Sequence, residues 1–293
     1  MISEPTLLFC LGANKAGTSW LYRYLAAHPE CRMPLIKELH YFDARHFGKV
    51  VAERRRISAL RHNAAQELGS ASGARAVALR AEVAELDEWL SVVDAGDVDD
   101  QAYRGFLMTR AGQAKLAGDM TPAYALLPEA VLGRMQSLAN SVRFLYILRD
   151  PVDRLWSNLR MNAARVSRDA GLVTTEALRM FDAWAAGGEQ PVRKRSDYAG
   201  TLARLTQAIR PANLSVIFYE RLFNPASMDR LCAFLGISPH PADFAKPVHA
   251  GVAAVLDAGR QAQARVLLAP HYDYVHRTIG DLPPRWRANM SER

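Results

Sequence analysis

A glycine-bearing loop between an apolar segment and an amphipathic segment constrains the fold of this chain more than any other feature. The loop runs from Gly12 to Trp20 and reads GANKAGTSW. The apolar run before it, 6–11, is a predicted strand, and the amphipathic run after it, 21–27, is a predicted helix. Backbone N–H groups and the dipole at a helix start favour an anion, and glycines permit close backbone approach. This order therefore predicts an α/β fold with an anion site at the loop.

The lysine of this loop is displaced from the usual nucleotide-binding position. The spacing nearly fits G-x-x-x-x-G-K-[ST], but Thr18 stands where that pattern has lysine, and Lys15 precedes Gly17. A lysine at this place could neutralise charge on a bridging or leaving phosphate oxygen without a metal. The alternative is a solvent-exposed lysine in an ordinary strand-to-helix turn.

Further apolar and amphipathic runs alternate along the rest of the chain. The predicted strands after the first are 115–119, 142–148 and 214–219. The predicted helices are 128–139, 151–166, 175–186, 198–209 and 227–235, with another C-terminal helix around 271–276. Strands separated by helices predict a three-layer α/β fold with a central parallel sheet. We interpret 1–293 as a single domain.

Residues 48–105 differ in character from the rest of that domain. They include stretches rich in Ala, Arg, Glu and Leu with helical periodicity, and the sequence at 69–73 is a turn. We predict a helical insertion built on two exposed helices, and we favour a structural hairpin over a binding arm.

The net charge of +7 restricts the class of partner. Such a charge suits nucleic acid, an anionic membrane surface or a polyanionic ligand. The arginines are spread through helical stretches with no recognisable nucleic-acid module, so we expect a small anionic ligand and no nucleic acid. No apolar run approaches the ~20 residues of a membrane span, and we see no signal peptide. We expect a cytoplasmic protein with no transmembrane segment, and peripheral membrane contact remains open. Cys10, Cys31 and Cys232 are interpreted as reduced thiols.

A second candidate site segment follows the strand 142–148. Ligands collect at the carboxyl ends of parallel strands, so Arg149 should project into the crevice beside the Gly12–Trp20 loop. Its guanidinium can bind a phosphate through two hydrogen bonds. Ser157, two helical turns further on, could add a hydroxyl donor. The alternative is that Arg149 and Asp150 form a structural pair.

These two segments resemble the sulfotransferases that use 3′-phosphoadenosine 5′-phosphosulfate (PAPS). Residues 15–21 are similar to the family's 5′-phosphosulfate loop, and residues 148–151 with Arg154 and Ser157 are similar to its 3′-phosphate motif. Two further segments resemble the heparan-sulfate-type (carbohydrate) branch. Lys-Glu-Leu-His-Tyr-Phe at 37–42 is similar to Lys-Glu-Pro-His-Phe-Phe, and residues 119–124 are similar to Glu-Lys-Thr/Ser-Pro-x-Tyr. The resemblance covers most of the chain outside the helical insertion.

The resemblance implies a P-loop-like fold and transfer of a sulfuryl group from PAPS, with no metal required. The donor-binding residues that it implies are Asn14, Lys15, Ala16, Gly17, Thr18, Ser19, Trp20, Arg149 and Ser157. Lys15 would stabilise the leaving phosphate as the S–O bond breaks. The acceptor would be a hydroxyl or an amine, on a carbohydrate or another small molecule.

Glu38 is the first candidate for the base that takes the acceptor proton, and His40 is the second. The structural alternatives are a salt bridge from Glu38 to Lys37 or an arginine, and a hydrogen-bonding role for His40 in an aromatic cluster. Asp119, Thr121 and Tyr124 are candidates for the acceptor side.

Some positions depart from the heparan-type pattern. Met120 stands where that pattern has lysine, and no basic glycine-rich loop over the nucleotide is recognisable. Lys246 or the cluster 193–195 could substitute for that loop. Two other functions stay open: a Mg²⁺-dependent phosphotransferase of the P-loop type, and a non-catalytic module that binds a nucleotide or a polyanion. We predict no metal site at His271 and His276.

Overall fold

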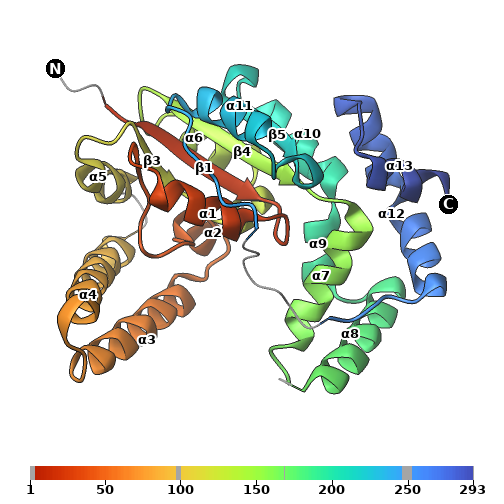
Figure 1. Cartoon of the computed structure of the whole chain (residues 1–293), viewed down its shortest axis with the longest axis horizontal. Helices are drawn as coiled ribbons and strands as arrows, with labels where there is room; N and C mark the ends of the chain where they lie inside the picture. The colour runs from red at the N-terminus through yellow and green to blue at the C-terminus, as the bar shows by residue number, and fades with distance from the viewer. Residues whose placement is uncertain (1–3, 97–99, 168, 246–252, 293) are drawn as a thin grey trace.

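A five-stranded, all-parallel sheet forms the centre of the molecule (Figure 1). The computed structural model describes residues 4–96, 100–167, 169–245 and 253–292. The strand order is β2-β3-β1-β4-β5. The strands are β1 (Thr6–Gly12), β2 (Cys31–Arg32), β3 (Leu116–Asp119), β4 (Val142–Leu148) and β5 (Leu214–Phe218). The predicted α/β fold with a parallel sheet is confirmed.

The two central strands are buried on both faces. Residues 7–11 of β1 and 144–148 of β4 are at most 1% exposed. They pair in parallel, with Phe9 opposite Phe144, and the two rings stack with centroids 5.4 Å apart. Near-continuous apolar runs are typical of parallel strands covered on both sides, which explains why these strands could be located from the sequence.

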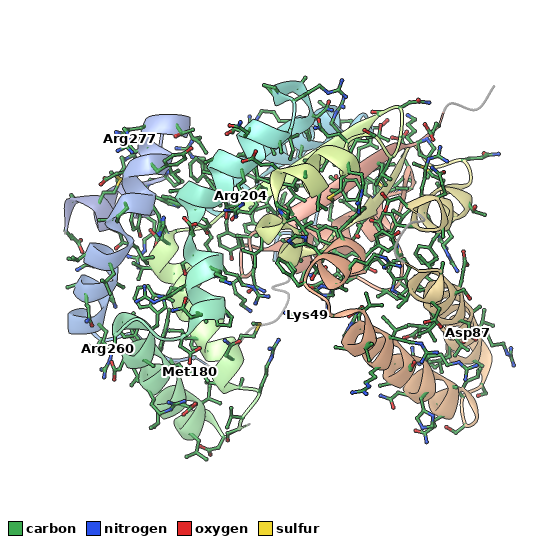
Figure 2. The ribbon with its side chains drawn as sticks, turned by 180° about the vertical axis from the view of Figure 1, so that it is seen from behind. Lys49, Asp87, Met180, Arg204, Arg260 and Arg277 are labelled. Atoms are coloured by element: carbon green, nitrogen blue, oxygen red, sulfur yellow. The ribbon has the colours of Figure 1, made fainter. Side chains whose placement is uncertain are left out.

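Helices cover both faces of the sheet. In Figure 1, α1 lies in front of the sheet, and Figure 2 shows α6 on the opposite face. The α-helices are α1 (Thr18–Ala27), α2 (Tyr41–His46), α3 (Val50–Leu68), α4 (Gly73–Asp94), α5 (Asp100–Ala111), α6 (Glu129–Met135), α7 (Pro151–Ala163), α8 (Ala170–Ala185), α9 (Gln190–Ser196), α10 (Tyr198–Ala208), α11 (Pro225–Leu235), α12 (Ala258–Ile279) and α13 (Pro284–Ser291). Short 3₁₀ helices are η1 (Pro122–Leu126), η2 (Pro211–Asn213) and η3 (Tyr219–Arg221). Among the described residues, no helix combines the length and the apolar character that crossing a membrane requires.

Several elements differ from their sequence-based predictions. Strand β2 was not predicted, because two residues are too few for a hydrophobic pattern. Helix α9 was not predicted either, since its basic sequence carries little apolar periodicity. The predicted helix 128–139 is too long: α6 ends at Met135, before a stretch that contains the turn-favouring Asn140.

The segment between α2 and β3 contains α3, α4 and α5. Helices α3 and α4 form a hairpin that extends away from the sheet, and in Figure 2 Asp87 of α4 lies on the opposite side of the molecule from Arg260 of α12. Exposed ion pairs join the hairpin helices, such as Arg61 to Asp87 at 2.9 Å. Aromatic packing fixes its base, where Tyr103 of α5 stacks on Tyr41 of α2 with centroids 4.4 Å apart.

The chain changes direction between β1 and β4. The connection after β1 leads toward β2 and β3, whereas the connection after β4 leads toward β5. Ligands of open α/β sheets bind at such a switch point, outside the carboxyl ends of the strands. The loop after β1 and the residues after β4 therefore form the first place to look for a site.

Candidate functional site

The loop between β1 and α1 presents backbone amides at a helix start. Gly17 is the residue before α1 and has a φ of +85°, and no side chain caps this end of the helix. The amides of Thr18 and Ser19 lie in the first turn, where a helix offers no internal acceptor. Ala16 closes the loop by donating its N–H to the carbonyl of Ala13 at 3.1 Å. N–H groups without an acceptor inside the helix, with the helix dipole behind them, suit an anion.

Lys15 lies in the same loop, in a strongly positive environment. Its φ is +70°, a conformation uncommon outside glycine. Burial lowers the pKa of its ammonium group, and the nearby charges of Arg149, Arg160, Arg165 and Lys37 lower it further. Like charges held together in this way are stabilised by an anion bound among them.

Arg149 faces the loop from the end of β4. Its Nη1 donates to the carbonyl of Lys15 at 2.9 Å, and its guanidinium lies 4.8 Å from the ring centroid of Tyr219. Its Nε is buried and has no hydrogen-bond partner among the described residues. The hydroxyl of Tyr198 holds the Arg149 backbone by donating to its carbonyl at 2.9 Å and accepting from its N–H at 3.2 Å.

Asp150 has partners other than Arg149, so the structure does not support the alternative of a pair between them. Its carboxylate accepts hydrogen bonds from the N–H groups of Val152 and Asp153, which caps α7. It also accepts from the hydroxyl of Tyr272 at 2.7 Å and from the amide of Asn289 at 3.0 Å. These bonds attach α12 and α13 to the end of β4 and leave Arg149 available to a ligand.

Ser157 and Arg160 lie one turn apart on α7, so they share a face of that helix. Burial lowers the pKa of Arg160, and so does the charge of Arg149, which indicates that the two guanidinium groups lie near each other. Arg154 differs: it is fully buried and donates to Asn158 and to the hydroxyl of Ser196. Ser157 is half-buried and can face a ligand, whereas Arg154 lies in the interior.

The other loop residues lie at different depths. Asn14 has a buried side-chain oxygen with no partner among the described residues, and Thr18 is buried. Trp20 is buried: it stacks on Tyr24 and Phe244, and its Nε1 donates to the carbonyl of Asp243 at 3.1 Å. Trp20 thus holds the 243–244 segment against α1.

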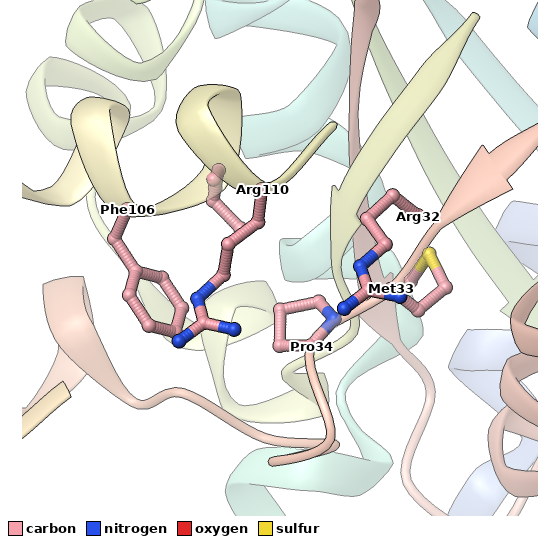
Figure 3. Close-up of a pocket in the computed structure, with 6 residues that line it drawn as sticks. Arg32, Met33, Pro34, Phe106 and Arg110 are labelled. Atoms are coloured by element: carbon pink, nitrogen blue, oxygen red, sulfur yellow. The ribbon is translucent and has the colours of Figure 1, made fainter. Parts of the chain in front are cut away.

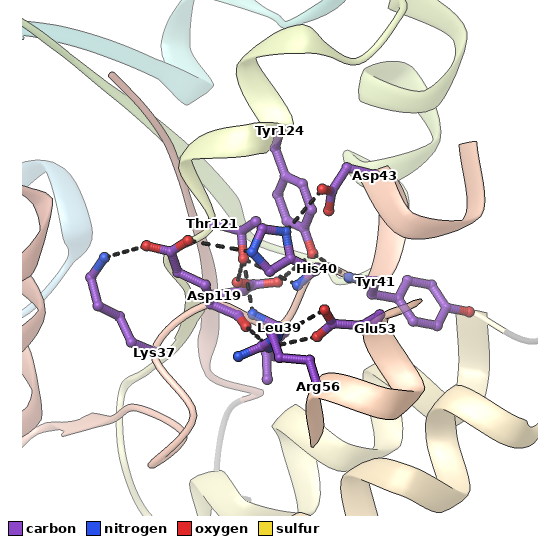
Figure 4. Close-up of polar contacts among 11 residues, drawn as sticks. Lys37, Leu39, His40, Tyr41, Asp43, Glu53, Arg56, Asp119, Thr121 and Tyr124 are labelled. Carbon is purple, nitrogen blue, oxygen red and sulfur yellow. Dashed lines mark hydrogen bonds and ion pairs between the residues drawn. The ribbon is translucent and has the colours of Figure 1, made fainter. Parts of the chain in front are cut away.

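Residues 35–43, which we call the 35–43 segment, carry a group of charges (Figure 4). The Glu38 carboxylate lies 2.7 Å from Nζ of Lys37 and 3.4 Å from Nε2 of His40. The other ring nitrogen of His40, Nδ1, lies 2.9 Å from the carboxylate of Asp43. The salt bridge from Glu38 to Lys37, expected as an alternative to a role as base, is therefore present. Asp43 was not predicted, although its spacing of three residues from His40 was a signal for contact at a helix start.

These contacts fix the charges of both candidate bases. Burial raises the pKa of Glu38, but the hydrogen bond from His40 and the charge of Lys37 lower it more, to about 2. Burial lowers the pKa of His40, but hydrogen bonds to Asp43 and Glu38 raise it more, to about 10. At neutral pH, Glu38 is therefore ionised and His40 is an imidazolium. Of the two, only Glu38 is ready to accept a proton.

Asp119, Thr121 and Tyr124 lie beneath this segment and are at most 1% exposed. Thr121 and Tyr124 donate to the Asp119 carboxylate at 2.6 and 2.7 Å. The Thr121 hydroxyl in turn accepts the N–H of Leu39 at 3.0 Å, and the Tyr124 hydroxyl accepts the N–H of Tyr41 at 3.0 Å. Thr121 and Tyr124 thus hold the backbone of the segment, and Asp119 holds their hydroxyl groups.

Three positions bear on the departures from the expected pattern. Met120 is fully buried, so a cation at that position would lie in the interior. Arg195 of α9 is half-buried; burial lowers the pKa of its guanidinium, whereas the charges of Glu38 and Asp43 raise it. It was noted in the sequence only as part of a basic cluster. Lys246 lies outside the described residues.

A depression elsewhere on the surface does not contribute to this site. Figure 3 shows a depression between β2 and α5, lined by Arg32, Met33, Pro34, Phe106, Leu107 and Arg110. None of these residues belongs to the candidate site. Across the described ranges of the chain, no group of three or more His, Cys, Asp or Glu side chains is arranged to hold a metal ion.

Comparisons with known proteins agree with this geometry. The model of the sulfotransferase family matches residues 5–241. A sulfotransferase of Alicyclobacillus acidocaldarius is similar in structure, with 21% identity, 98% of this chain and 100% of that chain covered, and a TM-score of 0.59. The sulfotransferase domain of the curacin biosynthetic pathway is similar with 20% identity, 98% and 97% coverage and a TM-score of 0.51. At these identities the likeness concerns the fold. A search of curated proteins finds no match.

Substituting Gly17 by alanine should damage the loop. Its φ is +85°, and an added Cβ would lie 3.0 Å from Cδ2 of Tyr219. We expect Gly17→Ala to lower the free energy of unfolding by about 1–3 kcal/mol. Gly105→Ala is the matched control, because it adds a Cβ to α5 in open space and should stabilise by up to about 1 kcal/mol. Urea denaturation measures both, and equal effects would contradict the strained geometry of the loop.

Proposed function

The chain belongs to the sulfotransferase family, and we propose that it moves a sulfuryl group from PAPS to an acceptor hydroxyl or amine. The observation that carries this proposal is the meeting of Lys15 and Arg149 at the switch point between β1 and β4, where Arg149 donates to the Lys15 carbonyl at 2.9 Å. Two cations from adjacent strand ends, beside the uncapped first turn of α1, suit a ligand that carries several negative charges.

The residues at the switch point fit the two phosphate groups of such a donor. The amides of the α1 first turn, with the hydroxyls of Thr18 and Ser19, would hold the 5′-phosphosulfate. Arg149, whose buried Nε has no partner among the described residues, would bind the 3′-phosphate together with Ser157. Donors without a 3′-phosphate would leave this guanidinium unpaired, which would select against them.

Lys15 and Glu38 would divide the chemistry. When bound, the donor supplies a sulfuryl group whose S–O bond to the 5′-phosphate breaks. Lys15 would stabilise the negative charge that develops on the leaving oxygen. The acceptor oxygen or nitrogen forms the new bond to sulfur, and Glu38 would take the proton that the acceptor loses. His40 and Lys37 would orient the Glu38 carboxylate through their contacts with it.

For the acceptor we propose a carbohydrate or another small molecule. The support is the likeness of residues 37–42 and 119–124 to heparan-sulfate-type segments, together with the charge of Arg195 near Glu38. A guanidinium in that place favours an acceptor with a carboxylate or sulfate close to the reacting group.

The purified protein, incubated with PAPS, should add sulfo groups to members of an acceptor panel, detected by mass spectrometry. The panel contains neutral oligosaccharides, uronic-acid oligosaccharides and 4-nitrophenol. Lys15→Met should lower turnover by about 100-fold or more, as loss of a group that stabilises transition-state charge does. The affinity for 3′-phosphoadenosine 5′-phosphate, measured by calorimetry, should fall far less.

Lys49→Met is the control, because Lys49 is exposed and lies outside the site. Full turnover in Lys15→Met would remove Lys15 from the mechanism. Donor binding without transfer to any acceptor would favour a non-catalytic module, and transfer from ATP that requires Mg²⁺ would favour a phosphotransferase.

The pH dependence distinguishes Glu38 from His40 as the base. The pKa of Glu38 is lowered to about 2 and that of His40 is raised to about 10. A Glu38 base is ionised throughout the neutral range, so single-turnover rates should be level between about pH 5 and 8. A neutral His40 base would instead lose about tenfold in rate for each pH unit below 10.

His40→Asn should move the acid limb of this profile upward, because Glu38 loses a cation that favours its ionised form. His276→Asn is the control, since His276 is exposed on α12. A rate that rises steadily with pH in the unchanged protein would transfer the role of base to His40.

Arg195→Met should raise KM for uronic-acid acceptors by about 10-fold or more, since a charge-assisted hydrogen bond contributes about 1.5–3 kcal/mol. KM for neutral oligosaccharides and for PAPS should stay unchanged. Lys194→Met removes the same charge from the neighbouring, exposed position and should have little effect. Equal losses in both variants would indicate a general effect of charge, and unchanged KM in Arg195→Met would exclude the guanidinium from acceptor binding.

A further inference from the structure

The helices inserted between α2 and β3 contact the 35–43 segment at separate points. Glu85 of α4, which is buried, accepts the N–H groups of Leu35 at 2.5 Å and Ile36 at 3.3 Å. Arg56 of α3 donates from Nη2 to the carbonyl of Glu38 at 2.9 Å. The insertion is thus bonded to the backbone before the candidate base and at the base itself.

The side chain of Arg56 is 40% exposed, but Glu53 holds its guanidinium in place. The two residues are three apart on α3, and Glu53 accepts from Nε at 2.9 Å and from Nη2 at 2.5 Å. Glu53 is only 8% exposed. A bidentate pair with a buried carboxylate fixes the plane of the guanidinium, so little further ordering is needed for its bond to Glu38.

The bond from Arg56 acts on a peptide group that is also held from the other side. The carbonyl of Glu38 and the N–H of Leu39 belong to the same planar peptide unit. Arg56 binds the oxygen of this unit, and the Thr121 hydroxyl binds its N–H at 3.0 Å (Figure 4). A peptide held at both ends cannot rotate without breaking a bond, so it fixes the direction in which the chain leaves Glu38.

His40, the residue after Leu39, needs such support. His40 has a φ of +51°, in the left-handed region that costs a non-glycine residue about 1–2 kcal/mol. The same residue must present Nε2 to Glu38 and Nδ1 to Asp43. The Thr121 hydroxyl also accepts the N–H of His40 at 3.4 Å, so the same side chain holds the peptide before His40. Release of the Glu38–Leu39 peptide would loosen this stretch and separate the imidazolium from the Glu38 carboxylate.

We propose that Arg56, held by Glu53, is a positioning residue that locks the Glu38–Leu39 peptide and thereby orients the Glu38 carboxylate for catalysis. The helical insertion is then part of the catalytic apparatus, although none of its residues needs to touch the donor. This inference rests on the proposed role of Glu38 as the base. It gives α3 a role that no sequence pattern in the insertion predicts.

Arg56→Met keeps the length of the side chain and removes the bond to the Glu38 carbonyl. We expect kcat for the panel acceptor that the unchanged protein sulfates fastest to fall by about 10- to 100-fold, the usual cost of a misplaced catalytic group. KM for PAPS and the affinity for 3′-phosphoadenosine 5′-phosphate should not change. Arg56→Lys keeps a donor and a charge and should recover part of the lost rate.

Arg61→Met is the matched control. Arg61 is also on α3 and also pairs with a carboxylate, that of Asp87 at 2.9 Å, but its pair lies within the hairpin and away from Glu38. It should retain full kcat. An equal loss of kcat in Arg56→Met and Arg61→Met would show that the hairpin is only a structural support and would overturn the proposal. A loss of kcat in Arg56→Met that is explained by a lower melting temperature would do the same.

The double variant with Glu38→Gln tests whether Arg56 acts through Glu38. If it does, Arg56→Met slows the unchanged protein but does not slow Glu38→Gln further. Full additivity of the two losses, or unchanged kcat in Arg56→Met, would overturn the positioning role while leaving Glu38 as the base. Unchanged kcat in Glu38→Gln would instead overturn the base assignment and this inference with it, so the two failures are distinguishable.

Discussion

The parallel pairing of β1 with β4 is the constraint on which the rest of the structure depends. It brings together the loop after Gly12 and the turn at Arg149, which are more than one hundred residues apart in the chain. The pairing continues past the sheet, because Ala13 donates its N–H to the carbonyl of Ile147 at 2.9 Å. The positive charges of Lys15 and Arg149 therefore lie close together at the ends of β1 and β4. Asp150 caps α7 and does not neutralise them. The sheet thus stabilises an arrangement of cations that a bound anion would complete.

A buried carboxylate, Asp119, connects the sheet to the 35–43 segment. Burial raises its pKa to about 6, but hydrogen bonds from Thr121, Tyr124 and Tyr103 favour its ionised form. Tyr103 belongs to α5, so the same carboxylate also receives a bond from the inserted helices, at 2.8 Å. An unpaired carboxylate here would be strongly destabilising, which makes the three hydroxyl groups necessary partners. The hydroxyls of Thr121 and Tyr124 also hold amides of the 35–43 segment, because a hydroxyl can donate and accept at once.

The sequence predicts the sheet well because buried parallel strands have a visible signature. Strand β4 was located at its observed bounds, and β1, β3 and β5 differ by a residue at one end. The candidate site was only partly accessible to the same reasoning. Arg56 touches Glu38 through a backbone carbonyl, and a bond to backbone imposes no residue type on its partner and leaves no pattern in the sequence. The position of Arg195 near Glu38 was also not predictable from the sequence. It depends on the packing of α9 against α7 and η1, which are distant from α9 in the chain. Position 120 shows most clearly what a motif comparison cannot reveal. Met120, which stands where the heparan-type pattern has lysine, is fully buried, so this difference lies in the interior of the protein.

The two groups of charge in the site are not independent, and Lys37 connects them. Its ammonium lies 2.7 Å from Glu38, and its charge also lowers the pKa of Lys15. Without a ligand, Glu38 has a pKa of about 2 and is a weak base. A multiply charged anion bound at Lys15 and Arg149 would offset the surrounding positive charge and add a like charge near the carboxylate. Both effects raise the pKa of an acid, so Glu38 would become a stronger base only when the donor is in place. Contacts from α3 and from the Asp119 network already hold Glu38 and His40 in this ligand-free arrangement. Donor binding would therefore have to change only the electrostatics of the site.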